Sequence, residues 1–203
     1  MNNFDDVART WDENPIHLDR SQAIALKMEE TLPLSKDMKA LEYGAGTGIL
    51  SFLLSEKLGH ITMMDSSSEM VKVMEEKVLS RKSTNLTPVW MNLEKERPYA
   101  TYDLIYNQMV LHHISDIGSI FEKFYSLVSP DGYLVIADLY TEDGSFHGEG
   151  PDVHLGFDPE ALKEMLLKTG FKNVSYEQCY TVKRESAGAA PKLFPVFLLA
   201  ASK

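Results

Sequence analysis

The glycine-rich segment Leu41-Glu42-Tyr43-Gly44-Ala45-Gly46-Thr47-Gly48 carries the clearest chemical pattern in this chain of 203 residues. Glycines at alternate positions let the backbone turn sharply and approach a ligand with no Cβ in between. The helix expected after it would offer free N–H groups and a positive dipole end to an anionic group. The dinucleotide fingerprint G-x-G-x-x-G would need a glycine at Ile49, so the segment does not match it.

Glu42 adds a carboxylate two residues before the first of these glycines. A carboxylate at that place would repel a pyrophosphate, whereas it would suit the ammonium of an amino-acid group. We therefore expect a ligand with an amino-acid end. The alternative is a tight structural turn that binds nothing.

Two adjacent histidines, His112 and His113, follow a short apolar segment that we expect to be the fourth strand. Histidine titrates near neutral pH, so either ring could take a proton from a substrate. We expect only one of the two to face the site, because neighbours on a helical turn point in different directions. The alternative for His112 is a packing or helix-capping role.

A long segment without periodicity, residues 139–157, carries His147 and His154 among several carboxylates, with Asp152 one of them. Segments of this length without regular structure are more often functional than plain connectors. We expect His147 to lie on the substrate side as a third catalytic candidate. Histidines mixed with carboxylates could hold a divalent metal ion. No tight ligand spacing supports that alternative, so the sequence predicts no metal site.

Strand-like and helix-like segments alternate along the chain, which predicts an α/β fold with a doubly wound, mostly parallel sheet. We expect seven strands, the last two forming a C-terminal antiparallel hairpin. The predicted strands are 38–43, 60–65, 87–92, 102–106, 133–138, 174–183 and 193–201; the predicted helices are 4–11, 16–31, 47–58, 66–80, 117–128 and 158–169. Residues 1–203 should form one domain, with residues 1–32 as a helical cap over the ligand cleft.

The chain has 30 acidic and 20 basic residues, which gives a formal net charge of −10. A surface this negative repels phosphate backbones, so we expect no nucleic-acid partner. The single cysteine, Cys179, allows no internal disulfide and is compatible with a cytoplasmic location. We find neither a signal-peptide pattern nor an apolar run of about 20 residues, so we also expect no membrane partner. We predict a cytoplasmic monomer or homodimer.

Five segments, in order, resemble the motifs of class I S-adenosylmethionine-dependent methyltransferases. The glycine-rich segment is similar to the first motif almost letter for letter. The others are Asp65-Ser66-Ser67-Ser68-Glu69-Met70, Trp90-Met91-Asn92-Leu93-Glu94, residues 102–114 with their Leu-His-His ending, and residues 127–134. Phe4, Ala8 and Trp11 also resemble small bacterial members of the class. The resemblance covers nearly the whole chain, and its one departure is Asp131, where glycine is usual.

The resemblance implies that the chain binds S-adenosyl-L-methionine and releases S-adenosyl-L-homocysteine. The glycine-rich segment would hold the methionine part, Asp65 the ribose hydroxyls, and Asn92 with Leu93 the adenine. Met70 would pack near the adenine, with simple helix core as an equal alternative. The residues expected at the cofactor are Trp11, Glu42, Tyr43, Gly44, Ala45, Gly46, Thr47, Gly48, Asp65, Ser66, Met70, Asn92, Leu93, Asn107 and Gln108.

The resemblance also implies transfer of a methyl group to a small-molecule acceptor by in-line displacement, with His112, His113 or His147 as a general base. The motif typical of amine methylators is replaced by Asn107-Gln108-Met109-Val110, which favours an oxygen, carbon or sulfur nucleophile. One alternative is a non-catalytic or regulatory cofactor-binding protein of the same fold. A nicotinamide-dependent dehydrogenase is disfavoured by the third glycine and by Glu42.

Overall fold

The computed structural model describes residues 3–96, 98–147, 153–186 and 189–203, and its centre is a seven-stranded sheet. The strands are β1 (Lys39–Tyr43), β2 (His60–Asp65), β3 (Leu86–Trp90), β4 (Tyr102–Gln108), β5 (Val128–Leu139), β6 (Lys172–Ser186) and β7 (Ala189–Ser202). Their order in the sheet is β3-β2-β1-β4-β5-β7-β6. β1 to β5 run parallel, and β7 is antiparallel to both of its neighbours. The predicted α/β class, the doubly wound sheet and the C-terminal hairpin are confirmed.

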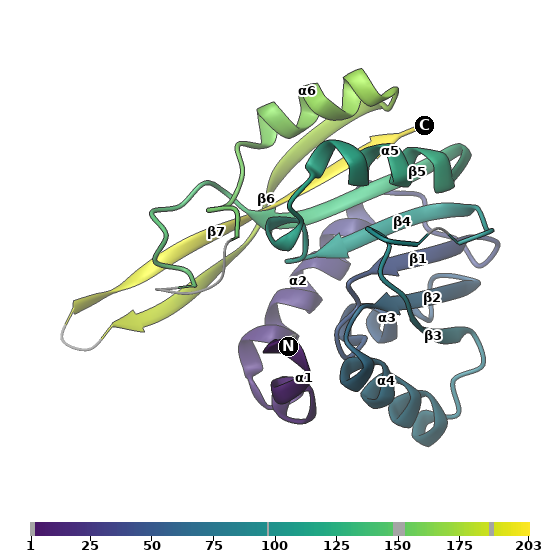
Figure 1. Cartoon of the computed structure of the whole chain (residues 1–203), viewed down its shortest axis with the longest axis horizontal. Coiled ribbons are helices and arrows are strands. Elements are labelled where there is room, and N and C mark those ends of the chain that lie inside the picture. The colour runs from purple at the N-terminus through teal and green to yellow at the C-terminus, as the bar shows by residue number, and fades with distance from the viewer. Residues whose placement is uncertain (1–2, 97, 148–152, 187–188) are drawn as a thin grey trace.

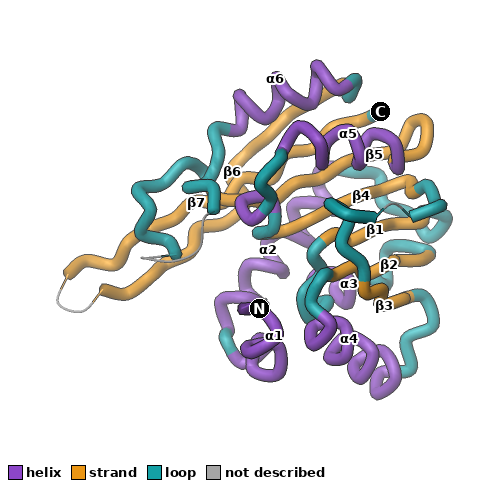
Figure 2. Tube along the Cα trace, in the orientation of Figure 1, coloured by secondary structure: helices purple, strands orange, loops and turns teal. Residues whose placement is uncertain are grey.

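Helices cover both faces of this sheet (Figures 1 and 2). They are α1 (Asn3–Val7), η1 (Ala8–Glu13), α2 (Pro15–Thr31), α3 (Ile49–Leu54), α4 (Ser68–Arg81), η2 (Leu111–His113), α5 (Ile117–Leu127) and α6 (Pro159–Thr169), where η marks a 3-10 helix. α2, α3 and α4 pack on one face and α5 and α6 on the other, each with its own apolar core. None of the described helices is long and apolar enough to cross a bilayer.

The two cores follow from the alternation of side chains along each strand. In β1, Ala40 packs with the α2 side, whereas its neighbour Leu41 packs with the α5 side. β4 repeats the pattern with Leu104 and Ile105. Because successive residues point to opposite faces, a strand buried on both sides must be apolar at nearly every position.

The starts of two helices are fixed by side chains that cap them. The Ser67 side chain accepts a hydrogen bond from the Met70 N–H and so caps α4. Asp158 caps α6 in the same way, with Pro159 in the first helical position. Local capping chemistry therefore determines these boundaries.

Several predicted boundaries differ from the structure. The strand expected over 133–138 is Val128–Leu139. The helix expected over 47–58 is only Ile49–Leu54, and it begins after Gly48, whose backbone is left-handed with φ of 81°. The hairpin strands are longer than expected, and Figure 1 shows them extending past the rest of the sheet. Residues 187–188 of its turn and residues 148–152 of the long segment, Asp152 included, lie outside the described residues.

The chain reverses its direction of strand addition at β1. This strand pairs with β2 on one side and with β4 on the other, so the first two crossovers and the later ones go in opposite directions. In such sheets ligands bind outside the carboxyl ends of the strands at this switch point. Tyr43, Asp65 and Gln108 end the three strands concerned.

Candidate active site

A cleft of about 1260 Å³ lies at these strand ends, and residues of α1, η1 and the start of α2 form one of its walls. Thirteen of the residues singled out from the sequence line it: Trp11, Tyr43, Gly44, Ala45, Gly46, Asp65, Ser66, Met70, Asn92, Gln108, His112, His113 and His147. The fold therefore brings the glycine-rich segment and the histidines into one cavity. The individual roles assigned to these residues stay predictions.

The backbone of the glycine-rich segment is left-handed at all three of its glycines, and two of them, Gly44 and Gly46, line the cleft. Gly44 has a φ of 69°, and a Cβ there would collide with the Val110 side chain. Gly46 has a φ of 58°, but the nearest atom to a Cβ at Gly46 would be Trp11 Nε1, 4.0 Å away. The space in front of Gly46 is thus open to the cleft, and a ligand could approach the backbone there.

Asp65 connects this segment to the end of β2. Its Oδ2 accepts a hydrogen bond from the Gly46 N–H at 2.7 Å, and its Oδ1 accepts one from the Ser67 N–H at 2.8 Å. Burial raises the pKa of this carboxyl, and the backbone N–H donors oppose that shift. Each carboxylate oxygen has a second lone pair, so Asp65 can still accept hydrogen bonds from the hydroxyls of a ligand.

Glu42 is fully buried behind the glycine-rich segment and does not line the cleft. Its Oε2 accepts hydrogen bonds from the Ser51 N–H at 3.1 Å and from the Ser51 hydroxyl, while no described residue bonds to its Oε1. Burial raises the pKa of this carboxyl to about 8. Glu42 therefore does not face the cleft, and this arrangement does not support the expected direct contact with an ammonium group there.

Four other residues expected at the cofactor also lie outside the cleft wall: Thr47, Gly48, Leu93 and Asn107. Thr47 turns its hydroxyl to Asp12 Oδ1, at 2.5 Å. Leu93 is fully buried in the core on the α5 side. The Asn107 amide is buried, and neither its oxygen nor its nitrogen has a partner among the described residues. Sequence position alone did not reveal which way these side chains turn.

The N-terminal wall of the cleft is held by carboxylates. Asp12 Oδ2 lies 2.6 Å from Lys77 Nζ, which also donates to the Thr47 carbonyl at 2.7 Å. Asp5 Oδ1 accepts a hydrogen bond from the Ser67 hydroxyl at 2.5 Å. These contacts attach α1 and η1 to α4 and to the glycine-rich segment.

His112 is the most constrained histidine of the cleft. Its Nδ1 lies 2.6 Å from Asp138 Oδ1, and its backbone N–H donates to Asp138 Oδ2 at 3.3 Å. Asp138 is fully buried at the end of β5. The carboxylate therefore fixes both the ring and the backbone of the short helix η2.

His113 and His147 lie beside His112, with ring centroids 4.2 Å and 5.0 Å from it. The expectation that only one of the two adjacent histidines faces the site is wrong, because the 3-10 turn presents both to the cleft. Burial, with the neighbouring histidines, lowers the pKa of His113 to about 4, and burial also lowers the pKa of His147. Both of these rings are therefore neutral at pH 7.

His154 has a different place. Its backbone N–H donates to the His112 carbonyl at 2.8 Å, and its Nε2 lies 2.9 Å from the Ile114 carbonyl. It does not line the cleft. His154 supports η2 from behind rather than facing a substrate.

Two arginines that line the cleft, Arg20 and Arg184, were not predicted from the sequence. Arg20 is 7% exposed, and in the described part of the chain its Nε has no hydrogen-bond partner. Burial lowers the pKa of this guanidinium to about 10, while Asp138 acts in the opposite direction. A signal was present, because Arg20 interrupts a series of apolar residues at four-residue spacing, between Ile16 and Ile24.

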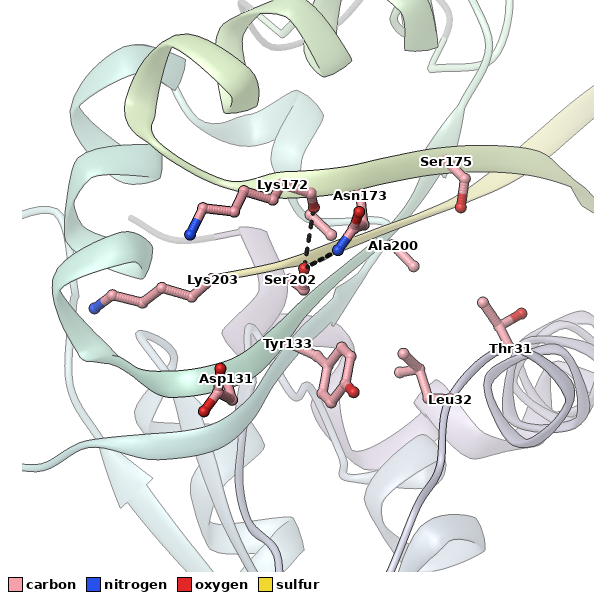
Figure 3. Close-up of a pocket in the computed structure, with 11 residues that line it drawn as sticks. Thr31, Leu32, Asp131, Tyr133, Lys172, Asn173, Ser175, Ala200, Ser202 and Lys203 are labelled. Carbon is pink, nitrogen blue, oxygen red and sulfur yellow. Dashed lines mark hydrogen bonds between the residues drawn. The ribbon is translucent and has the colours of Figure 1, made fainter.

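A second hollow of about 500 Å³ lies near the start of β6 and the end of β7 (Figure 3). Its polar contacts are internal: Asn173 Nδ2 donates to the Ser202 hydroxyl at 3.0 Å, and that hydroxyl donates to the Lys172 carbonyl at 3.3 Å. It lies at the opposite end of β5 from Asp138, and no histidine lines it. We therefore take the larger cleft as the candidate active site.

The model of the methyltransferase domain family matches residues 16–176 of the chain. The chain belongs to this family. Among curated relatives of this methyltransferase, phosphoethanolamine N-methyltransferase 1 of Zea mays is 31% identical over 73% of the chain and 31% of its own length. Malonyl-[acyl-carrier protein] O-methyltransferase 2 of Ilyobacter polytropus is 28% identical over 71% of the chain and 54% of its own length. The chain thus spans about a third to just over half of these relatives.

A solved structure of DhpI with S-adenosylhomocysteine superposes on this methyltransferase with a TM-score of 0.74. The two are 20% identical, and the match covers 98% of this chain and 92% of DhpI. At 20% identity, this similarity shows that the two chains share a fold. Because members of this family use S-adenosylmethionine, we compare that cofactor with the cleft. The open space at Gly46 is compatible with its amino-acid part, and the spare lone pairs of Asp65 are compatible with its ribose hydroxyls.

Proposed function

We propose that this methyltransferase moves the methyl group of S-adenosylmethionine to a small-molecule acceptor in the large cleft. One observation carries the proposal: the glycine-rich segment and Asp65 share a single cavity with His112, His113 and His147. One part of that cavity would hold a cofactor whose methyl carbon is already activated by the sulfonium. The other part places nitrogen lone pairs where an acceptor would sit.

The methionine part of the cofactor would lie against Gly44 and Gly46, and the ribose hydroxyls would donate to Asp65. Met70 and Asn92 would bound the adenine, because both line the cleft beyond Asp65. The N-terminal wall, residues 3–20, would exclude water from the reacting atoms. Exclusion of water strengthens polar contacts within the site and holds the reactants in line.

The acceptor would carry an acidic group. Arg20 supports this, because its guanidinium is buried at the cleft and has an unpartnered Nε. A buried donor without a partner costs about 1–3 kcal/mol, and a carboxylate or phosphate of the acceptor would remove that cost. The names of both relatives describe acceptors with such a group, a phosphate in phosphoethanolamine and a carboxylate in malonyl.

His112 is the candidate general base, since Asp138 orients its ring and stabilises the imidazolium that would form. An oxygen, carbon or sulfur nucleophile would need this proton transfer more than an amine does. The relatives include both an N- and an O-methyltransferase, so membership in the family does not determine which atom of the acceptor is methylated.

The experiment that tests this function is methyl transfer from labelled S-adenosylmethionine to pooled small metabolites. We expect labelled product with the wild-type protein, and at least about 100-fold less with His112→Ala, as is usual for loss of a general base. The competing function is a cofactor-binding protein without catalysis. Bound cofactor with no labelled product from any pool would favour that competitor.

A further inference from the structure

Three imidazole rings converge at the acceptor end of the cleft. One nitrogen from each of His112, His113 and His147 lies within 4.8 Å of the others, and the three ring centroids are 4.2–5.4 Å apart. Two of the rings come from η2, and the third comes from the segment after β5. Within the described part of the chain, this is the group whose side chains have a geometry that could hold a metal ion.

The contact of Asp138 with His112 is the first indication that the three rings form a metal-binding site. Its carboxylate is fully buried and occupies His112 Nδ1 at 2.6 Å, which leaves Nε2 as the free nitrogen. Histidines that bind metals usually donate their other ring N–H to a carboxylate or carbonyl in this way, which fixes the tautomer and raises the basicity of the ligand nitrogen.

His147 gives a second and independent sign. Its Nε2 is buried and has no hydrogen-bond partner among the residues that the structure describes. Leaving a buried polar atom without a partner is unfavourable, so its presence calls for a ligand. The residue belongs to a different segment from His112 and His113, so the chain brings it to them only through the fold.

We propose that His112, His113 and His147 bind one divalent transition-metal ion, such as Zn²⁺, at the acceptor end of the cleft. Imidazole is a preferred ligand for Zn²⁺ and its neighbours in the first transition row. Tetrahedral bonds of about 2.0–2.1 Å place ligand nitrogens about 3.3 Å apart. Rotations of the three side chains that bring each nitrogen in by about 1 Å would close the present cluster to that distance.

Three histidine ligands leave a fourth position open, as in zinc sites that take part in catalysis. All three histidines line the cleft, so this position faces it. On the function proposed above, it would take the oxygen or sulfur of the acceptor, and His112 would then be a metal ligand instead of the general base. The acceptor would release its proton to solvent on binding; its lone pair would then bond to the methyl carbon. The carbon–sulfur bond of the cofactor would break, and its electron pair would stay on the sulfur of S-adenosylhomocysteine.

The test is calorimetric titration of Zn²⁺ into the full chain after treatment with a chelator and without cofactor. We expect one Zn²⁺ per chain, at least about 10-fold weaker binding in His147→Ala, and about 10–100-fold weaker binding in Asp138→Asn. His60→Ala is the matched control, because His60 begins β2, at the end opposite the cleft, and should leave the affinity unchanged. Circular dichroism and cofactor binding would show that each variant is folded.

A second readout uses Co²⁺ in place of Zn²⁺, because its visible absorption reports nitrogen ligands in a tetrahedral arrangement. We expect that spectrum in the wild type and its loss in His147→Ala. Absence of stoichiometric Zn²⁺ binding, or binding that His147→Ala leaves unchanged, overturns the metal site. Cofactor binding and methyl transfer are measured separately, so that result would leave the proposed function, with His112 as base, intact.

Discussion

Asp65 is the residue on which the geometry of the cofactor end depends most. It accepts backbone hydrogen bonds from both the glycine-rich segment and the start of α4, and it does so at the floor of the cleft. A group in that position both shapes the loop and offers charge to a ligand. Replacing Asp65 should therefore weaken ligand binding more than it lowers the stability of the fold.

Asp65→Ala should weaken binding of S-adenosylhomocysteine by about 10- to 150-fold, because a hydrogen bond to a charged group contributes about 1.5–3 kcal/mol. Calorimetry with the product avoids turnover during the titration. Asp37→Ala is the control, since Asp37 is exposed in the turn before β1 and should bind as the wild type does. Equal affinities in both variants would remove Asp65 from the site.

Glu42 gives a prediction about pH. Its pKa is raised from 4.5 to about 8 in the folded protein, so the folded state holds a proton that the unfolded chain releases. The binding of this proton stabilises the folded state. Its contribution to the free energy of unfolding is fully present below pH 4.5 and is lost as the pH rises through about 8. Relative to Glu42→Gln, the free energy of unfolding of the wild type should fall over this window, by at most about 1.4 kcal/mol per pH unit.

Urea unfolding of both proteins between pH 5 and pH 9 measures this difference. Glu13→Gln, an exposed substitution in η1, should run parallel to the wild type at every pH. A constant difference between the wild type and Glu42→Gln would show that Glu42 is ionised throughout.

At the scale of elements, the N-terminal helices form a wall of the cleft that polar contacts attach to α4 and to the glycine-rich segment. Asp12 holds η1 to both Thr47 and Lys77. Asp12→Ala should therefore loosen the wall and weaken cofactor binding several-fold, without a comparable loss of global stability. Limited proteolysis should cut residues 3–14 sooner in this variant.

Glu13→Ala is the matched control for Asp12→Ala, because Glu13 is a neighbouring carboxylate of η1 and is exposed. Cofactor affinity and proteolysis should match the wild type in that control. Weaker binding in both variants would mean that the charge of the segment, rather than the Asp12 contacts, is responsible.

Local signals made some elements predictable. The side chains of Ser67 and Asp158 cap the helices that follow them directly in sequence, close to the predicted helix starts, whereas Gly48 moves the start of its helix past the predicted one. Long-range contacts were less accessible: His147 meets His112 only because the segment after β5 folds back over η2. Arg20 was missed because a single charge within an apolar helix face is easily read as exposed.

At the scale of the whole molecule, the strand order explains why separate motifs form one cleft. The reversal at β1 brings the ends of β1, β2 and β4 together, and the end of β5 adds Asp138 beside them. Motif spacing in the sequence could predict this meeting of segments. Motif spacing could not predict which side chains face the cleft. Glu42 and Leu93, for example, are buried and do not line it.

The absence of a nucleic-acid partner, the monomer or homodimer state and the cytoplasmic location stay predictions. A net charge of −10 disfavours a nucleic-acid acceptor. An acidic small acceptor would instead need the local positive charge of Arg20 and Arg184, both of which line the cleft.

Calorimetric titration of the wild-type protein with S-adenosylmethionine, and separately with NAD, tests the central claim most directly. The cleft geometry predicts one S-adenosylmethionine bound per chain and no measurable heat with NAD, because Ile49 replaces the third glycine of the dinucleotide fingerprint. Tight binding of NAD, with no binding of S-adenosylmethionine, would contradict the claim.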